Sequence, residues 1–241
     1  MVFPQNVSLG SIPIWGLGDP GAFPSVHGLS SDEKTLIIEE IKRVDGDIDE
    51  FIRRLLAVSD EQEFERTFDQ GIEIMFKLVQ LVSLVFVSCF SNERRREEFI
   101  NLTEELLVRT FRELKTELEE LRQNIGILDD VLKELSVVFD YELWLLSNIR
   151  KQGFVIFATK IMSRCFEELI GAQKHRLALL LIVRIFHNIA SGKAPPPNSK
   201  VMTMLLRKLK THSDELDAYL DTLYTLLDDE AYEIILAKEH A

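Results

Sequence analysis

The residues of this chain that could do chemistry are few and scattered. Its five histidines are His27, His175, His187, His212 and His240. A di-iron helical bundle needs several Glu-x-x-His motifs, because its two metal ions take carboxylate and imidazole ligands from facing helices. The sequence contains no such motif. It has one His212-x-x-Glu215, which we interpret as a solvated junction between two helices.

Clustered carboxylates are a second route to metal chemistry in helical proteins. The candidates are Asp129-Asp130 and the group Asp228-Asp229-Glu230 with Glu233. Neither group has a spaced third carboxylate or a matching partner motif for Mg²⁺. Paired acids at the start of a helix also complement the helix dipole, which is the simpler account of Asp129 and Asp130. We therefore expect no metal site.

The remaining reactive side chains favour structural roles. Cys89 and Cys165 each lie inside an apolar run, so we expect buried free thiols, which suit a reducing compartment. His187 lies on an apolar helical segment and is expected to be a hydrogen-bonded core residue. No phosphate-binding glycine loop or Gly-x-Ser-x-Gly motif occurs. We expect a protein that is not an enzyme and has no cofactor.

Composition narrows the class of protein further. The chain has 241 residues and a formal net charge of −12, which disfavours a role in coating DNA. The longest uncharged apolar stretch, residues 78–90, makes about 20 Å of helix, short of the roughly 30 Å of a bilayer core. The first positive side chain is Lys34, so no basic region of a secretory signal is recognisable. The expected location is the cytoplasm.

Proline and glycine placement gives the clearest indication of secondary structure. Four of the seven prolines and five of the eleven glycines lie in the first thirty residues, and none of the other prolines precedes Pro195. Because proline disrupts a helix interior, the long proline-free stretch rich in Leu, Glu, Lys and Arg favours helix throughout. No window alternates with a period of two, so we predict no β-sheet. The predicted fold class is all-α, a bundle of seven or eight helices.

Four parts are expected along the chain. They are an extended apolar arm (1–30), a bundle core (31–192), a proline-rich linker (193–199) and a C-terminal helical pair (200–241) packed on the bundle. The first helix is predicted from Ser31 to about Ala57, and the second begins after a Ser59-Asp60 cap. Further helices are predicted to end at Gly153, to span 154–172 and 174–191, and to begin at Ser199 and at Ser213 or Asp214.

A leucine ladder runs through the middle of the chain. Its members alternate steps of four and three, the pattern of a coiled-coil seam. They are Leu107, Phe111, Leu114, Leu118, Leu121, Ile125, Leu128, Leu132, Leu135 and Phe139. A continuous helix from about 93 to 151 would project from a compact chain and require a partner helix. Alternatively Gly126 ends one helix in a left-handed cap and a helical hairpin forms, which is the alternative we favour.

The arm, residues 1–30, has an unusual composition. It contains eleven large apolar residues, among them Phe3, Ile12, Ile14, Trp15, Leu17 and Phe23, and a single charged side chain, Asp19. A disordered tail is normally polar and charged, so these side chains need a surface to cover them. The arm is expected either to pack on its own bundle or to dock on a neighbouring copy.

Charge is distributed unevenly towards the C-terminus. Residues 140–212 hold four acids and twelve bases, whereas residues 213–241 hold nine acids and one lysine. The acidic last helix could lie against the basic ones. Alternatively a basic face is exposed to an acidic partner, anionic lipid or RNA phosphate. That face would contain Arg150, Lys151, Lys160, Arg164, Lys174 and Arg176, with Lys200, Arg207, Lys208 and Lys210 nearby.

These features favour a non-catalytic interaction or assembly protein, a scaffold or adaptor. It would self-associate through the arm, through the leucine ladder (Leu107, Phe111, Leu114, Leu118 and Leu121), or through both. One alternative is a protein that binds RNA or an anionic surface through residues 150–210. Another is a carrier of a hydrophobic ligand, with a cavity under residues 78–90 and 177–186.

Overall fold

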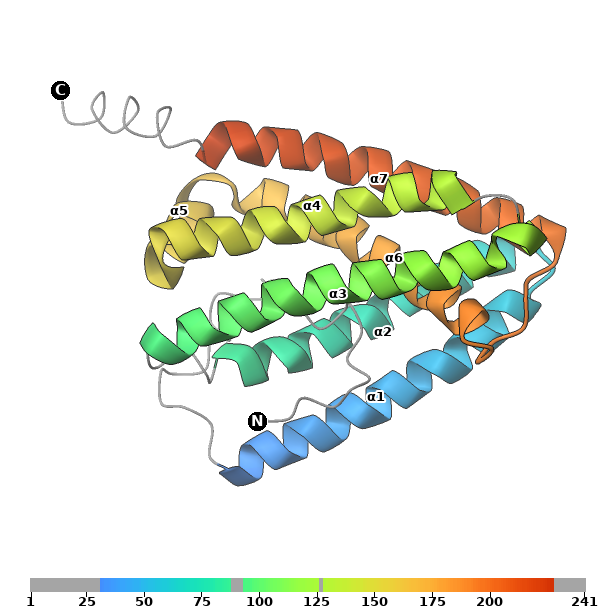
Figure 1. Ribbon diagram of the computed structural model, residues 1–241, viewed down its shortest axis with the longest axis horizontal. Helices are drawn as coiled ribbons and strands as arrows, with labels where there is room; N and C mark the ends of the chain where they lie inside the picture. The colour runs from blue at the N-terminus through green and yellow to red at the C-terminus, as the bar shows by residue number, and fades with distance from the viewer. Residues whose placement is uncertain (1–30, 88–92, 126–127, 228–241) are drawn as a thin grey trace.

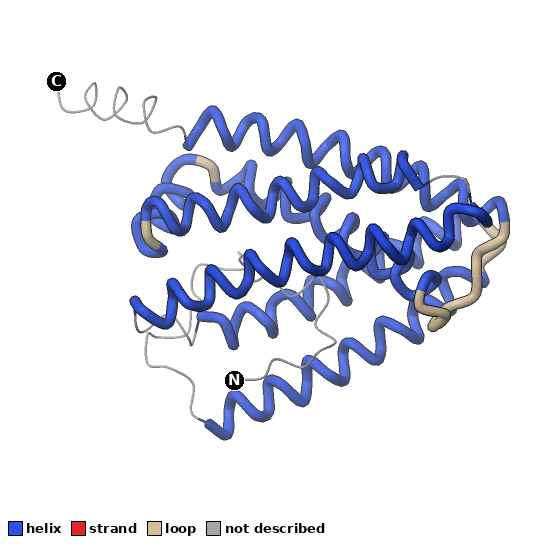
Figure 2. Tube along the Cα trace, viewed as in Figure 1, coloured by secondary structure: helices blue, strands red, loops and turns tan. Residues whose placement is uncertain are grey.

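The computed structural model describes residues 31–87, 93–125 and 128–227, which form seven helices and no strand (Figure 2). The helices are α1 (Ser31–Ala57), α2 (Glu61–Val87), α3 (Glu93–Ile125), α4 (Leu128–Gln152), α5 (Phe154–Arg164), α6 (Phe166–Ala190) and α7 (Ser199–Leu227). The predicted all-α bundle is confirmed for these residues. None of these seven helices combines the length and apolarity that a bilayer crossing requires. The predicted arm lies outside the described residues.

The bundle is organised around α6. α1 packs against α2, α3 packs against α4, and α7 lies along α6 and α4 (Figure 1). α6 also contacts α2, α3 and α5. Every side chain from Arg176 to Phe186 is buried. A helix that is apolar on most sides must be covered on most sides.

Local capping residues begin or end several helices where the sequence predicts. The Asp60 carboxylate accepts a hydrogen bond from the backbone N–H of Glu63 at 3.0 Å, which caps α2. Gly153 and Gly192 have φ values of 72° and 71°, in the left-handed region that a side chain disfavours. Gly153 separates α4 from α5, and Gly192 follows the end of α6.

The leucine ladder is divided between two antiparallel helices. α3 ends at Ile125 and α4 begins at Leu128. Arg150, near the end of α4, lies 2.8 Å from the carboxylate of Glu104 and 3.6 Å from that of Glu97, near the start of α3. The hairpin that we favour from the sequence is therefore present. The predicted left-handed cap at Gly126 lies outside the described residues.

The predicted break between helices 154–172 and 174–191 is wrong. The chain breaks at Cys165, between α5 and α6, and α6 continues through Gly171. A Cβ atom at Gly171 would collide with the ring of Tyr219 on α7. Glycine is needed here because α7 packs so closely, and it does not mark the end of a helix.

The predicted C-terminal helical pair is also wrong in the described residues. α7 is one continuous helix from Ser199 to Leu227. Ser213, expected to cap a new helix, is buried and donates its hydroxyl hydrogen to the backbone carbonyl of Glu134 on α4 at 3.0 Å. A serine that can cap a helix thus binds a neighbouring helix instead.

A buried cluster of polar groups joins α1 to α6. Arg184 of α6 is 5% exposed and lies 2.7 Å from the carboxylate of Asp49 and 3.1 Å from that of Asp45 on α1. Arg184 donates two hydrogen bonds to Asp49, and Asn188 donates a third. Burial alone would raise the pKa of Asp49, but the hydrogen bonds from Asn188 and Arg184 outweigh it and lower this pKa. The cluster therefore holds an ionised carboxylate against the central helix.

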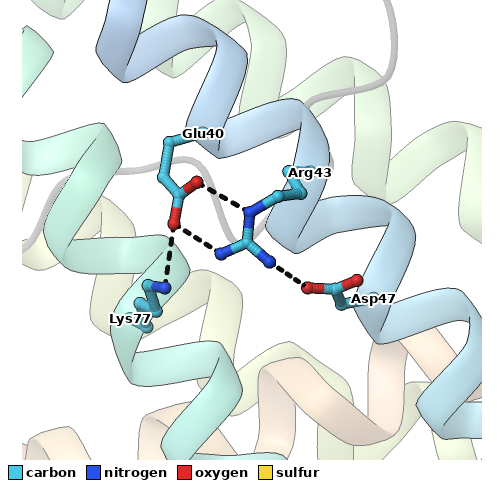
Figure 3. Close-up of polar contacts among 4 residues, drawn as sticks. All are labelled: Glu40, Arg43, Asp47 and Lys77. Atoms are coloured by element: carbon cyan, nitrogen blue, oxygen red, sulfur yellow. Dashed lines mark hydrogen bonds and ion pairs between the residues drawn. The ribbon is translucent and has the colours of Figure 1, made fainter.

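A second network joins α1 to α2 at the surface (Figure 3). The Glu40 carboxylate accepts hydrogen bonds from Arg43, at 2.6 and 2.8 Å, and from Lys77 of α2 at 2.9 Å. Arg43 also pairs with Asp47. These hydrogen bonds, with that from Arg43 the largest influence, lower the pKa of Glu40 to about 2. Because water surrounds the network, its contribution to stability is small.

The two networks predict different costs of removing an arginine. Arg184→Met leaves Asp45 and Asp49 without their partner at the α1–α6 contact, and we expect it to lower the free energy of unfolding by about 3 kcal/mol. Arg43→Met, at the exposed network, is the matched control and should barely move the urea midpoint. Equal midpoint shifts for the two variants would contradict this account.

Candidate functional site

Two histidines meet at the contact between α6 and α7. The Nδ1 atoms of His175 and His212 are 3.0 Å apart, so one imidazole donates its N–H to the other. His212 is 9% exposed and stacks on the ring of Phe68 from α2. The ring of His175 lies against Tyr219 of α7. Our interpretation of His212 as part of a solvated junction is wrong, because three helices enclose its ring.

The surroundings of this pair favour neutral imidazoles. Burial lowers the pKa of His212 to about 4, and the charges of His175, Lys208 and Lys174 act in the same direction. Burial also lowers the pKa of His175, with Glu215 acting in the opposite sense. One neutral imidazole can donate to another, whereas two imidazolium ions present only donors at this distance.

This pair does not extend to a metal site. Among the residues that the structure describes, no three histidine, cysteine, aspartate or glutamate side chains are grouped as metal ligands would be. The Cys165 thiol is buried, as expected, and burial raises its pKa to about 12, which makes it a poor nucleophile. The candidate Asp228 group and the side chains of Asp129, Asp130 and Cys89 lie outside the described residues.

A second buried polar group occupies the contact between α4 and α6. Arg176 and Glu142 form an ion pair, and both side chains are fully buried. Gln173, one turn before Arg176, accepts a hydrogen bond from the guanidinium at 3.5 Å. Burial raises the pKa of Glu142 to about 7, while Arg176 acts to lower it. The hydroxyl of Tyr141, the second carboxylate oxygen of Glu142 and the Gln173 amide nitrogen have no protein partner.

The sequence predicts Arg176 on an exposed basic face, and this prediction is wrong. Its guanidinium is buried inside the bundle. Arg150 pairs with acids of α3. Lys151 and Lys174 are exposed, and Lys160 and Arg164 on α5 are half-buried. The six predicted contact residues do not form one continuous surface.

Three of the four bases of α7 pair with acids from other elements or from α7 itself, and the fourth binds a backbone carbonyl. Arg207 pairs with Glu61 at 2.6 Å, and Lys208 pairs with Glu65. Lys210 lies 2.6 Å from Asp214 and 3.3 Å from Glu134. Lys200 donates to the backbone carbonyl of Ser59. The acids that neutralise this basic segment come largely from α2 and α4, which we did not anticipate from the sequence.

The described members of the leucine ladder face the chain's own core. Leu107 and Leu114 are 1% and 3% exposed, and Phe111 packs against Phe139 with ring centroids 5.0 Å apart. The side chains of Leu118 and Leu121 lie outside the described residues, as do Phe3, Ile12, Ile14, Trp15, Leu17 and Phe23 of the arm.

The structure adds a surface that sequence reasoning missed, the outer face of α5. Its aliphatic members Val155, Ile156 and Met162 are 71%, 58% and 47% exposed. Spacings of one, six and seven residues place them on one side of the helix. Phe157 and Ile161, on the opposite side, are buried. Apolar residues occur on more than one side of α5, so only packing decides which of them stay uncovered.

The histidine pair predicts a loss of stability in acid. A histidine whose pKa is lowered by folding contributes stability that is complete above its unfolded pKa, near 6.5, and is lost as the pH falls through the folded value, about 4 for His212. Between pH 7 and pH 4.5 the wild-type chain should lose about 1–2 kcal/mol more free energy of unfolding than His212→Asn. Urea titrations at the two pH values measure this difference, and parallel losses would refute it.

The buried ion pair predicts strongly non-additive substitutions. Glu142→Leu leaves a buried guanidinium that cannot lose its proton, so we expect a loss of about 3–5 kcal/mol in the free energy of unfolding. Arg176→Met should cost less, because the Glu142 carboxyl can take up a proton. The double variant should recover most of the loss. A double-mutant cycle in urea measures the coupling, and simple additivity would contradict it.

Comparison with known proteins adds no family to this description. No protein-family model matches the chain, and neither a curated protein nor a solved structure is significantly similar to it. The function must therefore be argued from the side chains themselves.

Proposed function

We propose that this chain is a non-catalytic helical interaction protein that self-associates, with the arm of one copy docking on the outer face of α5 in another. The observation that carries the proposal is the exposure of Val155, Ile156 and Met162 on one side of an 11-residue helix. Grouped apolar exposure of this kind is typical of a binding surface.

The arm is the occupant that this surface fits best. It supplies eleven large apolar side chains and one charge. Burial of a large apolar side chain contributes roughly 1.5–3 kcal/mol, whereas association costs about 4–15 kcal/mol. Three aliphatic groups on α5 are too few for a stable dimer. Reciprocal exchange of two arms doubles the contact and closes the assembly as a pair.

The leucine ladder is not needed for this assembly. Leu107 and Leu114 already bury their side chains within the chain. A coiled-coil partner would have to displace α4 or α6 to reach them. Of the two apolar segments that the sequence offers for self-association, the arm is therefore the one that we expect a second copy to cover.

Phosphate binding through residues 150–210 receives less support. Arg176 is buried, and Arg150, Arg207 and Lys210 pair with carboxylates. RNA would have to compete with these acids for each base, in a chain of net charge −12. The pairing therefore favours protein docking over binding of RNA or an anionic surface.

Substitution on α5 tests the proposal. The double variant Val155→Asp with Ile156→Asp places two charges on the docking face, and we expect at least a tenfold weaker self-association by light scattering over a dilution series. Leu36→Asp is the matched control, because Leu36 is an aliphatic residue of α1 that is 66% exposed. It should leave association unchanged.

Two results would refute the proposal. One is a monomer at high micromolar concentration of the full chain. The other is that deletion of residues 1–28 leaves assembly unchanged. An effect of Leu36→Asp equal to that of the α5 variant would place the contact on α1 instead.

A further inference from the structure

Three polar atoms beside the buried ion pair of α4 and α6 have no hydrogen-bond partner among the residues that the structure describes. They are the hydroxyl oxygen of Tyr141, the Oε2 atom of Glu142 and the Nε2 atom of Gln173. Tyr141 and Glu142 are fully buried and Gln173 is 8% exposed, so bulk water does not reach them. Because the large majority of buried polar groups in proteins are paired, three unpaired atoms in one place indicate a small molecule that binds them.

The three atoms belong to side chains that surround one guanidinium. Arg176 binds Glu142 through its Nε atom and donates to the side-chain oxygen of Gln173 at 3.5 Å. Burial raises the pKa of the Tyr141 hydroxyl, and the charges of Arg176 and Glu142 act on it in opposite directions. Tyr141 directly precedes Glu142 on α4, and Gln173 precedes Arg176 by three residues on α6. The unpaired atoms thus form one polar cluster at the contact of two helices.

The atoms of this cluster are neighbours, but they do not bind one another. Tyr141 and Gln173 can each donate a hydrogen, whereas the ionised Glu142 carboxylate only accepts. Since neither donor makes a hydrogen bond to the Oε2 atom, both lie beyond direct reach of it. One water molecule between a donor and an acceptor spans roughly 4.5–5.5 Å, the length of two hydrogen bonds at an angle. Polar neighbours that share one guanidinium without touching are placed as a bridging molecule requires.

The mixture of two donors and one acceptor selects water as that molecule. Water accepts two hydrogen bonds and donates two, so it can accept from Tyr141 and Gln173 and donate to Glu142. Three hydrogen bonds are also what a buried water typically makes. A metal cation or an ammonium ion has no lone pair for the amide N–H of Gln173. An anion would lie against the negative charge of Glu142.

We propose that an internal water molecule is bound between α4 and α6 by the Tyr141 hydroxyl, the Gln173 amide and the second carboxylate oxygen of Glu142. It completes the hydrogen bonding around the ion pair and is part of the contact between the two helices. Because every group that holds it is buried, it exchanges with bulk water only when α4 and α6 separate. The site lies within one copy of the chain and does not depend on the proposed function.

Magnetic relaxation dispersion of water oxygen-17 tests the site in the full chain, because it detects waters that stay bound for longer than the protein takes to tumble. The pH is held well above 7, where Glu142 is ionised although burial raises its pKa to about 7. The test variant carries Tyr141→Phe and Gln173→Met, which remove both donors and preserve the side-chain shapes. The control carries the same exchanges at exposed positions, Tyr224→Phe and Gln62→Met.

At equal protein concentration, we expect the dispersion amplitude of the test variant to fall below that of the wild type and the control by the equivalent of a single water molecule. Equal amplitudes in the three proteins overturn the proposal, and so does a wild-type chain that shows no dispersion.

Urea unfolding of the single variant Tyr141→Phe is a second test, and it applies even if the double variant does not fold. If the hydroxyl binds water, its removal breaks a hydrogen bond and lowers the urea midpoint. If the hydroxyl has no partner, its removal relieves an unfavourable burial and raises the midpoint. Tyr224→Phe is the matched control, because the Tyr224 side chain is 51% exposed, and it should leave the midpoint unchanged. We expect a midpoint below that of the wild type, and a midpoint equal to or above it overturns the internal water.

Discussion

Two guanidinium groups buried on one central helix constrain the rest of the structure. Arg176 and Arg184 lie two turns apart on α6, and neither can shed its charge. Each therefore needs a carboxylate supplied from another helix, Glu142 on α4 for the first and Asp45 with Asp49 on α1 for the second. Apolar packing alone tolerates sliding of one helix along another. These ion pairs fix where α1 and α4 stand along α6.

The same rule of local neutralisation governs the outside of the molecule. Acids of α2, α3 and α4 form ion pairs with bases of α4 and α7. Glu40 of α1 pairs with Arg43 on the same helix and with Lys77 of α2. A surface so paired has little attraction left for phosphate. The outer face of α5 differs, because its exposed groups are aliphatic and charge pairing cannot satisfy them. That contrast is why the proposed function centres on α5.

Some features followed from local rules alone. The Asp60 cap, the left-handed Gly153 and Gly192 and the buried run of α6 depend on residues within one or two turns, which a sequence displays. Predictions failed where the role of a residue depends on its contact with a helix that is distant in the sequence. Gly171 admits the ring of Tyr219, and Ser213 binds the Glu134 carbonyl, so neither one ends or starts a helix. The same residue types end or start helices elsewhere, and nothing local distinguishes the two uses.

The sequence by itself determined that the described chain is helical, because periodicity and proline placement act within a helix. Only the tertiary structure decided which polar groups meet. His175 contacts His212, which is 37 residues away in the sequence, and Arg184 contacts Asp49, which is 135 residues away. It also decided that Val155 and Ile156 face outwards while Phe157 faces inwards. All three are large apolar residues, so the side of α5 that packs on the bundle decides which of them is buried.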